Sequence, residues 1–401
     1  MADNTTTVTA QCLCKAHTFT STVPTTALPL DATCCHCTSC RRSTGALYFV
    51  DAKWPSPSED VSLLKRYSPS ENIDVFFCAT CSSPLFCRRT GPDDPLCVIT
   101  AALQNAPDLV QYSSHIFVGD TVDGGASIWF RKRQDGTPQR RWKARPPTDD
   151  DDGDDRPGEE MPEDWSDTPA VPIADSSQPW PKLTPIRCHC GGVDLLLRNA
   201  SDLAATPAEE LPFFVDPTTF KYLATFDVCD SCRLSFGVDV PNWTFALLSH
   251  IEFPSEEGGL AAQGTFPRSV ADLTSAVSSI EKRDARLGTL QLYKSSWDVE
   301  RFFCSRCSAV VFYACDDRAD MVDVAVGLLD HPSGARAEGL LTWNIGRVGG
   351  SGDVVGGWRE GLVQHVLEES EQWRIRQGHP KTWNRVLREK QEQEQAEKAA
   401  A

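Results

Sequence analysis

The sequence predicts a mainly β protein with two tandem zinc-stapled domains, a disordered acidic linker and a C-terminal helix. Three observations lead to this prediction: blocks of sequence that recur in the second half of the chain, cysteines in close pairs, and short β-branched and aromatic runs between turn residues. The 401 residues are enough for two domains of ordinary size.

The repeat consists of three blocks in one order. "ATCCHCTSCRRSTG" from Ala32 and "ATFDVCDSCRLSFG" from Ala224 are identical at eight of fourteen positions without a gap. Downstream, "FFCATCSSPLF" from Phe76 matches "FFCSRCSAVVF" from Phe302, and upstream "QCLCKA" matches "RCHCGG". Three blocks in the same order predict a duplicated domain. We place the copies at residues 8–130 and 184–350.

Residues 131–183 are expected to be a linker. The span opens basic, "RKRQDGTPQRRWKARPP", and turns acidic, "DDDDGDDRPGEEMPEDW", with many prolines and few apolar residues. Such composition cannot bury enough apolar surface to fold, so we expect a solvated tether. The basic half could alternatively serve as a nuclear-import or docking segment.

The remaining elements follow from local patterns. "LCVITAAL", "WTFALLSH" and "AVVFYAC" predict strands near Val98, Phe245 and Val311. An insertion at 266–284 has the apolar spacing of a surface helix, and residues 358–376 place an apolar stripe on one helical face that should dock on the protein itself. Residues 351–401 are thus a C-terminal helix followed by a charged, frayed tail.

The net charge and the N-terminal sequence limit which partners and which cellular compartment we expect. The formal net charge of −17 argues against nucleic acid as a partner, even through the basic segment 131–145. No apolar run is long enough to span a membrane, and "MADNTTTVTAQ" lacks the pattern of a secretory signal. We expect a cytoplasmic protein, with the nucleus as the alternative, and 17 reduced cysteines that favour metal binding over disulfides.

Each copy has a Cys-x-Cys near its start and a Cys-x-x-Cys near its end. Two such pairs of thiolates can close a tetrahedral zinc site that staples distant segments and has no open position. The alternatives are unrelated buried thiols or a redox-active pair. We therefore predict two structural zinc sites, one formed by Cys12, Cys14, Cys78 and Cys81 and the other by Cys188, Cys190, Cys304 and Cys307.

The loop "CCHCTSC" predicts a different site. Cys35, Cys37 and Cys40 have no distant pair to complete four ligands, and three protein ligands with an open position are typical of catalytic zinc. A thiol bound there would be deprotonated yet nucleophilic, which points to carbon–sulfur chemistry. Arg41 and Arg42 are candidates for binding a substrate carboxylate; the alternatives are ordinary surface charge or relief of the negative charge of the site.

Neighbouring residues receive simpler assignments. His36 is expected to be a spacer and Cys34 a packed neighbour, while Cys87, Cys97 and Cys315 show no spacing signal and are assigned to the core. In the second copy the loop reads Asp227, Cys229, Cys232. A vestigial loop is favoured there, and a weak fourth zinc site is the alternative.

The order Cys-x-Cys, Cys-His-Cys-x-x-Cys-Arg, Phe-Cys-x-x-Cys resembles the glutathione-dependent formaldehyde-activating enzymes and their relative centromere protein V. "SHIFV" at 114–118 is similar to the closing segment of that family. The resemblance implies a β-tent fold, one structural zinc at Cys12, Cys14, Cys78 and Cys81, and a glutathione-facing zinc at Cys35, Cys37 and Cys40. This sequence departs from the family at Lys15, Val75, Ser82, Ser308 and Asp227.

The sequence therefore favours a carbon–sulfur lyase that joins a small thiol such as glutathione to a small aldehyde such as formaldehyde, or splits the adduct. Its catalytic loop is Cys35, Cys37 and Cys40, and no histidine or carboxylate base stands out by spacing. The rival interpretation is a non-catalytic, zinc-stabilised interaction module, which the acidic linker and the altered second loop favour.

Overall fold

The computed structural model describes residues 4–56, 59–91, 94–133, 135–147, 158–162, 164–166, 180–255, 265–279, 281 and 283–400. We call residues 4–147 the first half and residues 180–349 the second half. The described part of the chain is mainly β with five α-helices, and one of these closes the chain. The predicted mainly β class and the C-terminal helix are confirmed.

The first half contains a two-stranded sheet and an eight-stranded sheet. The eight-stranded sheet has the order β10-β9-β3-β4-β8-β7-β6-β5 and is antiparallel except where β9 pairs with β3 and β10. The strands are β1 Thr5–Gln11, β2 Thr18–Pro24, β3 Leu30–Cys35, β4 Phe49–Lys53, β5 Lys65–Ser70, β6 Ile73–Phe77, β7 Pro84–Arg89, β8 Cys97–Ile99, β9 Val110–Ile116 and β10 Arg140–Arg141. Helix α1 (Thr38–Thr44) follows β3 directly.

The second half contains a three-stranded sheet and a seven-stranded sheet. The larger sheet has the order β16-β17-β18-β19-β14-β13-β20. The strands are β11 Leu183–Arg187, β12 Asp194–Arg198, β13 Tyr222–Asp227, β14 Asn242–Leu247, β15 Ile251–Glu252, β16 Leu290–Ser296, β17 Val299–Cys304, β18 Val310–Cys315, β19 Met321–Ala325 and β20 Leu341–Gly349. Helix α2 (Asp230–Phe236) follows β13, and α3 (Val270–Ser278) is the predicted surface helix, with three buried apolar side chains.

The two large sheets share one order of strands. Leaving out the edge strand β10, each strand of the first sheet has a counterpart at the same place in the second, and each sheet has one parallel pair, β3 with β9 and β13 with β20. The strands expected near Val98, Phe245 and Val311 are β8, β14 and β18. This shared order is what a duplicated domain predicts.

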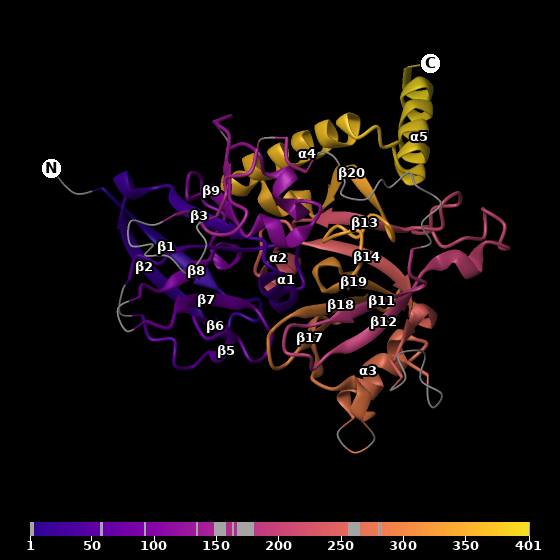
Figure 1. The fold of residues 1–401 in the computed structure, drawn as a ribbon, viewed down its shortest axis with the longest axis horizontal. Helices are drawn as coiled ribbons and strands as arrows, with labels where there is room; N and C mark the ends of the chain where they lie inside the picture. Colours follow the sequence, from indigo (N-terminus) through magenta and orange to yellow (C-terminus); the bar gives the residue numbers. More distant parts are fainter. Residues whose placement is uncertain are drawn as a thin grey trace.

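The halves pack through their short helices, which lie between the two large sheets (Figure 1). Helix α1 packs on the 3₁₀ segment Val326–Leu328 of the second half, and α2 packs on the 3₁₀ segment Thr100–Ala102 of the first. The Gly327 amide donates to the Gly45 carbonyl at 2.8 Å. Each half therefore inserts its loop helix against the other half.

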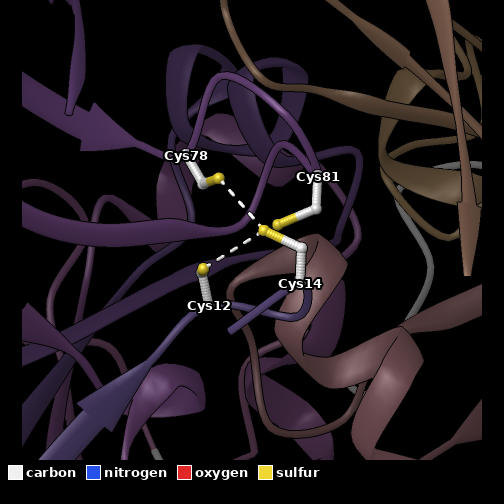
Figure 2. A group of neighbouring side chains, drawn as sticks. All are labelled: Cys12, Cys14, Cys78 and Cys81. Atoms are coloured by element: carbon white, nitrogen blue, oxygen red, sulfur yellow. Dashed lines mark hydrogen bonds between the residues drawn. The ribbon is translucent and has the colours of Figure 1, made fainter. Parts of the chain in front are cut away.

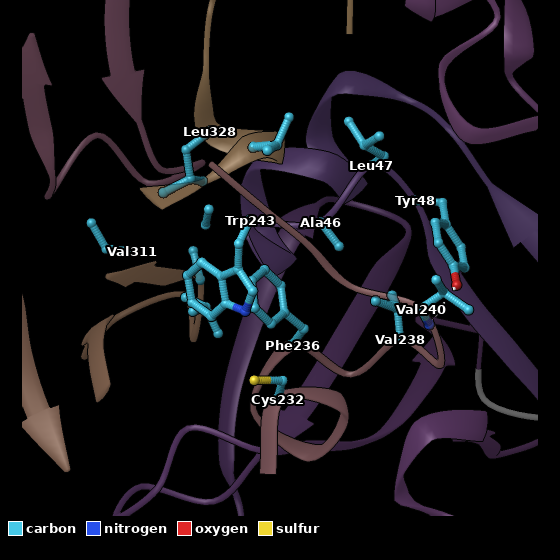
Figure 3. Packing of buried hydrophobic residues seen from close by; sticks show 14 of the residues in the cluster. Ala46, Leu47, Tyr48, Cys232, Phe236, Val238, Val240, Trp243, Val311 and Leu328 are labelled. Carbon is cyan, nitrogen blue, oxygen red and sulfur yellow. Dashed lines mark hydrogen bonds between the residues drawn. The ribbon is translucent and has the colours of Figure 1, made fainter. Parts of the chain in front are cut away.

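A continuous apolar core fills this contact. Figure 3 shows Ala46, Leu47 and Tyr48 of the first half near Val238 and Val240 of the second. The Val240 amide donates to the Tyr48 hydroxyl at 3.1 Å across the interface. Because buried residues of both halves form one cluster, the hydrophobic stabilisation is shared between them.

The basic part of the expected linker is folded. Strand β10 pairs in parallel with Ser114 and His115, and the side chains of Arg131, Arg141 and Trp142 are buried. The amide of Met161 in turn donates to the Arg141 carbonyl at 2.7 Å. The expectation of a solvated tether is wrong for residues 131–133 and 135–147, while most of the acidic part lies outside the described residues.

Helix α4 (Trp358–Arg376) spans both halves (Figure 1). It packs on the 3₁₀ segment Gly125–Trp129 of the first half and on β20 of the second. Its residues Trp358, Leu362, Val363 and Val366 are buried, so the predicted apolar stripe docks on the protein itself. The tail beyond it differs from expectation, because residues Trp383–Ala400 form helix α5 instead of a frayed end.

Candidate metal centre and thiol site

Four thiols of the first half converge where β1 and β6 end. The Sγ atoms of Cys12, Cys14, Cys78 and Cys81 all lie within 4.8 Å of one another, and Figure 2 shows the four side chains pointing to a common centre. The Cys14 sulfur is 3.6 Å from the sulfurs of Cys12 and Cys78. Zinc–sulfur bonds of about 2.3 Å in a tetrahedron place neighbouring sulfurs about 3.8 Å apart. The cluster fits zinc.

The second half has a matching cluster. Cys188 and Cys190 follow β11, and Cys304 and Cys307 lie at the end of β17. The Cys190 and Cys304 sulfurs are 3.4 Å apart, and the Cys304 sulfur also lies 3.0 Å from the Thr289 hydroxyl oxygen. Since these are four converging sulfurs in close pairs, this donor set fits zinc as well.

The three-thiol loop lies where β3 passes into α1. Cys35 ends the strand, Cys37 is the N-cap of the helix, and Cys40 is in its first turn. The Cys40 amide donates to the Cys37 sulfur at 3.3 Å. The three sulfurs lie within 4.8 Å of one another and each residue is half-buried, so the loop gathers three sulfur donors without a fourth from this group.

The three thiols shift one another's pKa values through shared hydrogen bonds. Hydrogen bonds from Cys35 and Cys40 lower the pKa of Cys37, and the same bonds shared with Cys37 raise the pKa of Cys35 and of Cys40. The three thiols therefore share hydrogen bonds that stabilise a thiolate within the group. Three thiolates would need a cation to neutralise them.

Arg41 is buried and its guanidinium is occupied by the loop. It donates to the His36 carbonyl at 3.3 Å, to the Thr38 hydroxyl at 3.2 Å and to the Asp120 carbonyl at 3.4 Å. These bonds make Arg41 a residue that holds the loop, so the geometry argues against the predicted substrate-binding role. Arg42 is more exposed and pairs with Asp330 of the second half at 2.8 Å.

His36 points away from the three sulfurs. Its Nε2 lies 2.9 Å from Nδ1 of His115, whose Nε2 lies 3.0 Å from the Phe130 carbonyl oxygen. Burial lowers the pKa of both histidines, to about 4 for His115. His36 is therefore a neutral core residue, and the fully buried Cys34 is the packed neighbour expected from the sequence.

The corresponding loop of the second half contains its own cation. Asp227, Cys229 and Cys232 place their ligand atoms within 4.8 Å of one another. Arg301, which is buried, donates from Nη1 to the Cys232 sulfur at 3.5 Å. Burial works to lower the pKa of Arg301, but the charge of Cys232 raises it overall. A guanidinium thus already supplies positive charge at this loop.

The second half also reaches the thiol loop of the first. The His189 amide donates to the Arg42 carbonyl at 3.0 Å, and its Nδ1 lies 2.5 Å from the Tyr67 hydroxyl. Burial lowers the pKa of His189, and the charge of the Cys37 thiolate works against that shift, which places the two residues near each other. Spacing along the sequence did not identify Tyr67 or His189.

One tyrosine of each half lies near the four-thiol cluster of the other half. Tyr67 of the first half lies near the four-thiol cluster of the second, and Tyr293 of the second lies near the cluster of the first. Burial raises the pKa of both hydroxyls, and the thiolates of the neighbouring cluster add to the shift. Each cluster is therefore covered partly by the other half.

One further cluster was missed by the sequence analysis. Asp51, Cys87 and Cys97 place one oxygen and two sulfurs within 4.8 Å of one another. Burial raises the pKa of Asp51 to about 6, against hydrogen bonds from the two thiols. The register of the strands brings this cluster together, because Cys87 on β7 is the direct partner of Cys97 on β8. Cys315, in contrast, is a buried cysteine as expected.

Comparison with known proteins gives one match. Residues 7–120 match the family model described as glutathione-dependent formaldehyde-activating enzyme. No curated protein and no solved structure was found to match the chain. In the described part of the chain, no helix combines the length and apolarity that crossing a membrane requires. The matched segment carries both first-half thiol clusters in the order seen in the sequence, and residues 7–120 are therefore similar to the glutathione-dependent formaldehyde-activating enzymes.

Proposed function

We propose that the first half is a carbon–sulfur lyase that joins a small thiol, such as glutathione, to a small aldehyde, such as formaldehyde, or splits the adduct. The observation that carries this proposal is the cluster of Cys35, Cys37 and Cys40 inside a segment of the formaldehyde-activating family. In the forward direction the thiol S–H bond breaks and a C–S bond forms at the carbonyl carbon. The carbonyl oxygen takes the proton, so an S-hydroxymethyl thioether results.

Cys35, Cys37 and Cys40 would hold a zinc ion, which supplies Lewis acidity and lowers the pKa of an incoming thiol. The donor set supports this role, because three half-buried sulfurs converge and leave a fourth position for a substrate. The two four-thiol clusters would hold structural zinc, since each closes its own donor set.

The residues of this chain would shape the site around that chemistry. Arg41 fixes the loop through three hydrogen bonds, and the cysteines come from the rigid junction of β3 and α1. Tyr67 and His189 would form one wall, which brings the second half into the site of the first. A catalytic pocket built on a strand end and a helix start holds its geometry better than one built on a loop alone.

The cytoplasm is the proposed place of action. The groups of close thiols support this, because clustered cysteines in a reducing compartment more often bind metal than form disulfides.

Replacing Cys37 by serine tests the function. Cys37→Ser is expected to abolish glutathione-dependent consumption of formaldehyde, measured by the loss of free aldehyde, because the loop then lacks the sulfur at the helix start. Cys229→Ser is the matched control, since Cys229 is the N-cap residue of α2 in the second half and is expected to keep activity near the wild-type level.

Two outcomes would contradict this proposal. Full activity in Cys37→Ser would separate the chemistry from the three-thiol loop. Absence of thiol-dependent turnover in the wild type, together with no effect of glutathione on its melting temperature, would instead favour the zinc-stabilised interaction module.

A further inference from the structure

We propose that Asp51, Cys87 and Cys97 form an additional binding site for a thiophilic divalent cation such as zinc. The proposal concerns metal binding alone and does not depend on the reaction proposed above. Its basis is the geometry of three adjacent strands, the charge around the cluster, and the different residues that the second half has at the same places.

Three neighbouring strands place the donors on one face of the sheet. Cys87 on β7 is the direct partner of Cys97 on β8, and Cys97 is the direct partner of Lys53 on β4. Asp51 lies two residues before Lys53 on the same strand, so its side chain points to the same face as that of Cys97. A hydrogen-bonded sheet holds these donors more rigidly than a loop does, and their ligand atoms lie within 4.8 Å of one another.

Among the described residues, no lysine or arginine forms an ion pair with Asp51, although Lys53 lies directly opposite Cys97 on the same face. Asp51 is half-buried, its carboxyl group lies beside the two thiols, and Arg89 acts on it through its charge. A buried carboxylate is costly unless a positive charge or donors compensate it. Two cysteines and one carboxylate are zinc ligands, and three of them leave one position for water or another ligand.

The second half has different residues at the positions that correspond to Cys87 and Cys97. By strand register, Cys87 corresponds to Tyr313 and Cys97 corresponds to Asp323. Asp323 pairs with Arg318 at 2.7 Å, and the Arg301 guanidinium lies over the Tyr313 ring at 5.1 Å. The sequence repeat aligns Arg301 with Val75 of the first half, which is uncharged. In the second half, arginines therefore lie beside the residues that correspond to Cys87 and Cys97, and a metal ion would supply positive charge to the first-half cluster.

The proposed site adjoins the three-thiol loop. Cys35 pairs with Phe49, and Asp51 lies two residues further along the same strand, which places Cys35 and Asp51 on one face roughly 7–8 Å apart. Phe49, Val75 and Ile99 form an apolar cluster that touches Cys35, Cys40 and Cys97. The two donor groups are therefore neighbours separated by apolar side chains, and each has its own ligands.

Counting metal ions in the full chain tests the proposal. The protein and its variants are saturated with zinc, passed through a desalting column and measured by native mass spectrometry. Cys97→Ser and the nearly isosteric Asp51→Asn are each expected to carry one zinc ion fewer than the wild type. Cys315→Ser is the control, because Cys315 is a buried cysteine of the second sheet outside every donor group found in the described residues.

A double variant separates this site from the thiol loop. Cys37→Ser and Cys97→Ser should each remove one ion, and the double variant should remove two. Equal zinc counts in the wild type, Cys97→Ser and Asp51→Asn would overturn the proposal. A double variant that loses no more zinc than Cys37→Ser alone would also overturn it, because the ion would then belong to the thiol loop. Asp51→Asn keeps the test decisive if Cys97→Ser does not fold.

Discussion

Gly45 combines two constraints at one residue. It ends α1 in the left-handed region with φ of +85°, and its carbonyl accepts the Gly327 amide of the second half. A Cβ atom here would lie 2.4 Å from the Val310 carbonyl oxygen, which belongs to the backbone and cannot rotate away. The residue that closes the helix after the thiol loop is thus also a point of close backbone approach between the halves.

Gly45→Ala is expected to lower the free energy of unfolding by about 3 kcal/mol, from left-handed strain and from overpacking. Urea denaturation followed by tryptophan fluorescence measures it. Gly136→Ala is the control, because Gly136 has φ of +82° but nothing within 4 Å of its Cβ position, and should cost only about 1 kcal/mol. Equal losses in both variants would show that the contact with Val310 carries no energy.

His115 makes the fold sensitive to acid. Burial lowers its pKa from 6.5 to about 4, so the folded state binds its proton less readily than the unfolded chain does. The stability that this residue contributes is present above pH 6.5 and is lost as the pH falls toward 4. Between pH 7 and pH 5 the loss from this one group is about 2 kcal/mol.

His115→Gln is therefore expected to flatten the decline in unfolding free energy between pH 7 and pH 5 by about 2 kcal/mol, when wild type and variant are compared by urea denaturation. The difference between the two proteins removes the contribution of other acid-sensitive groups. An unchanged slope would mean that His115 becomes charged without unfolding the protein.

At the scale of single residues, the spacing of the cysteines predicted the thiol clusters. Two cysteines that are close along the chain are necessarily close in space, so each pair acts as one unit. The pairs at Cys12 and Cys78 are brought together as that spacing suggested. Asp51, Cys87 and Cys97 escaped prediction because their proximity depends on the register of three strands. Arg41 shows a further limit, since sequence does not reveal whether an arginine faces a substrate or its own loop.

Among the elements, α4 acts as a brace across both halves. The Arg359 guanidinium is buried and pairs with Asp239 of the second half at 2.7 Å. Asp239 also accepts hydrogen bonds from the hydroxyls of Thr100 and Tyr112, at 2.5 and 2.6 Å. Three segments far apart in the sequence thus meet at one carboxylate, and burial makes each missing partner costly.

Arg359→Met is expected to lower the free energy of unfolding by about 3–5 kcal/mol, because it leaves the Asp239 carboxylate buried without its cation. Thermal and urea denaturation measure the change. Lys132→Met is the matched control: Lys132 pairs with Glu369 of the same helix at 3.4 Å but is half exposed, so a loss below about 1 kcal/mol is expected. A similar small loss in Arg359→Met would assign the docking of α4 to its apolar side chains alone.

Elements were predicted well where periodicity was strong and poorly where composition dominated. The spacing of Trp358, Leu362, Val363 and Val366 indicated α4, since a helix that docks on the protein buries the side chains of one face. The basic segment 131–147 was misassigned, because arginines with few apolar neighbours look solvated, yet Arg141 is buried and donates to the carbonyls of Pro162 and Trp165. Long side chains can cover a sheet edge in this way.

In the whole molecule, the two halves share one apolar core. One apolar cluster runs through both, each loop helix packs on the other half, and α4 joins them. The order of the blocks predicted two copies of one architecture, and the two large sheets do share their strand order. How the copies face each other was not predictable, since matching positions such as Tyr67 and Tyr293 do not reveal from the sequence that each contacts the other half.

The positions of Tyr67 and Tyr293 have a consequence for a protein cut in two. A first half expressed alone would expose the apolar surface around Ala46 and Leu47 and would lose the cover that Tyr293 gives to its own four-thiol cluster. Because the first half carries both Tyr67 and the cluster equivalent to the one that Tyr67 covers, a second copy of itself offers the same complementary surface. Residues 4–147 alone are expected to form a symmetric homodimer, which sedimentation would reveal; a stable monomer would show that the halves do not depend on each other.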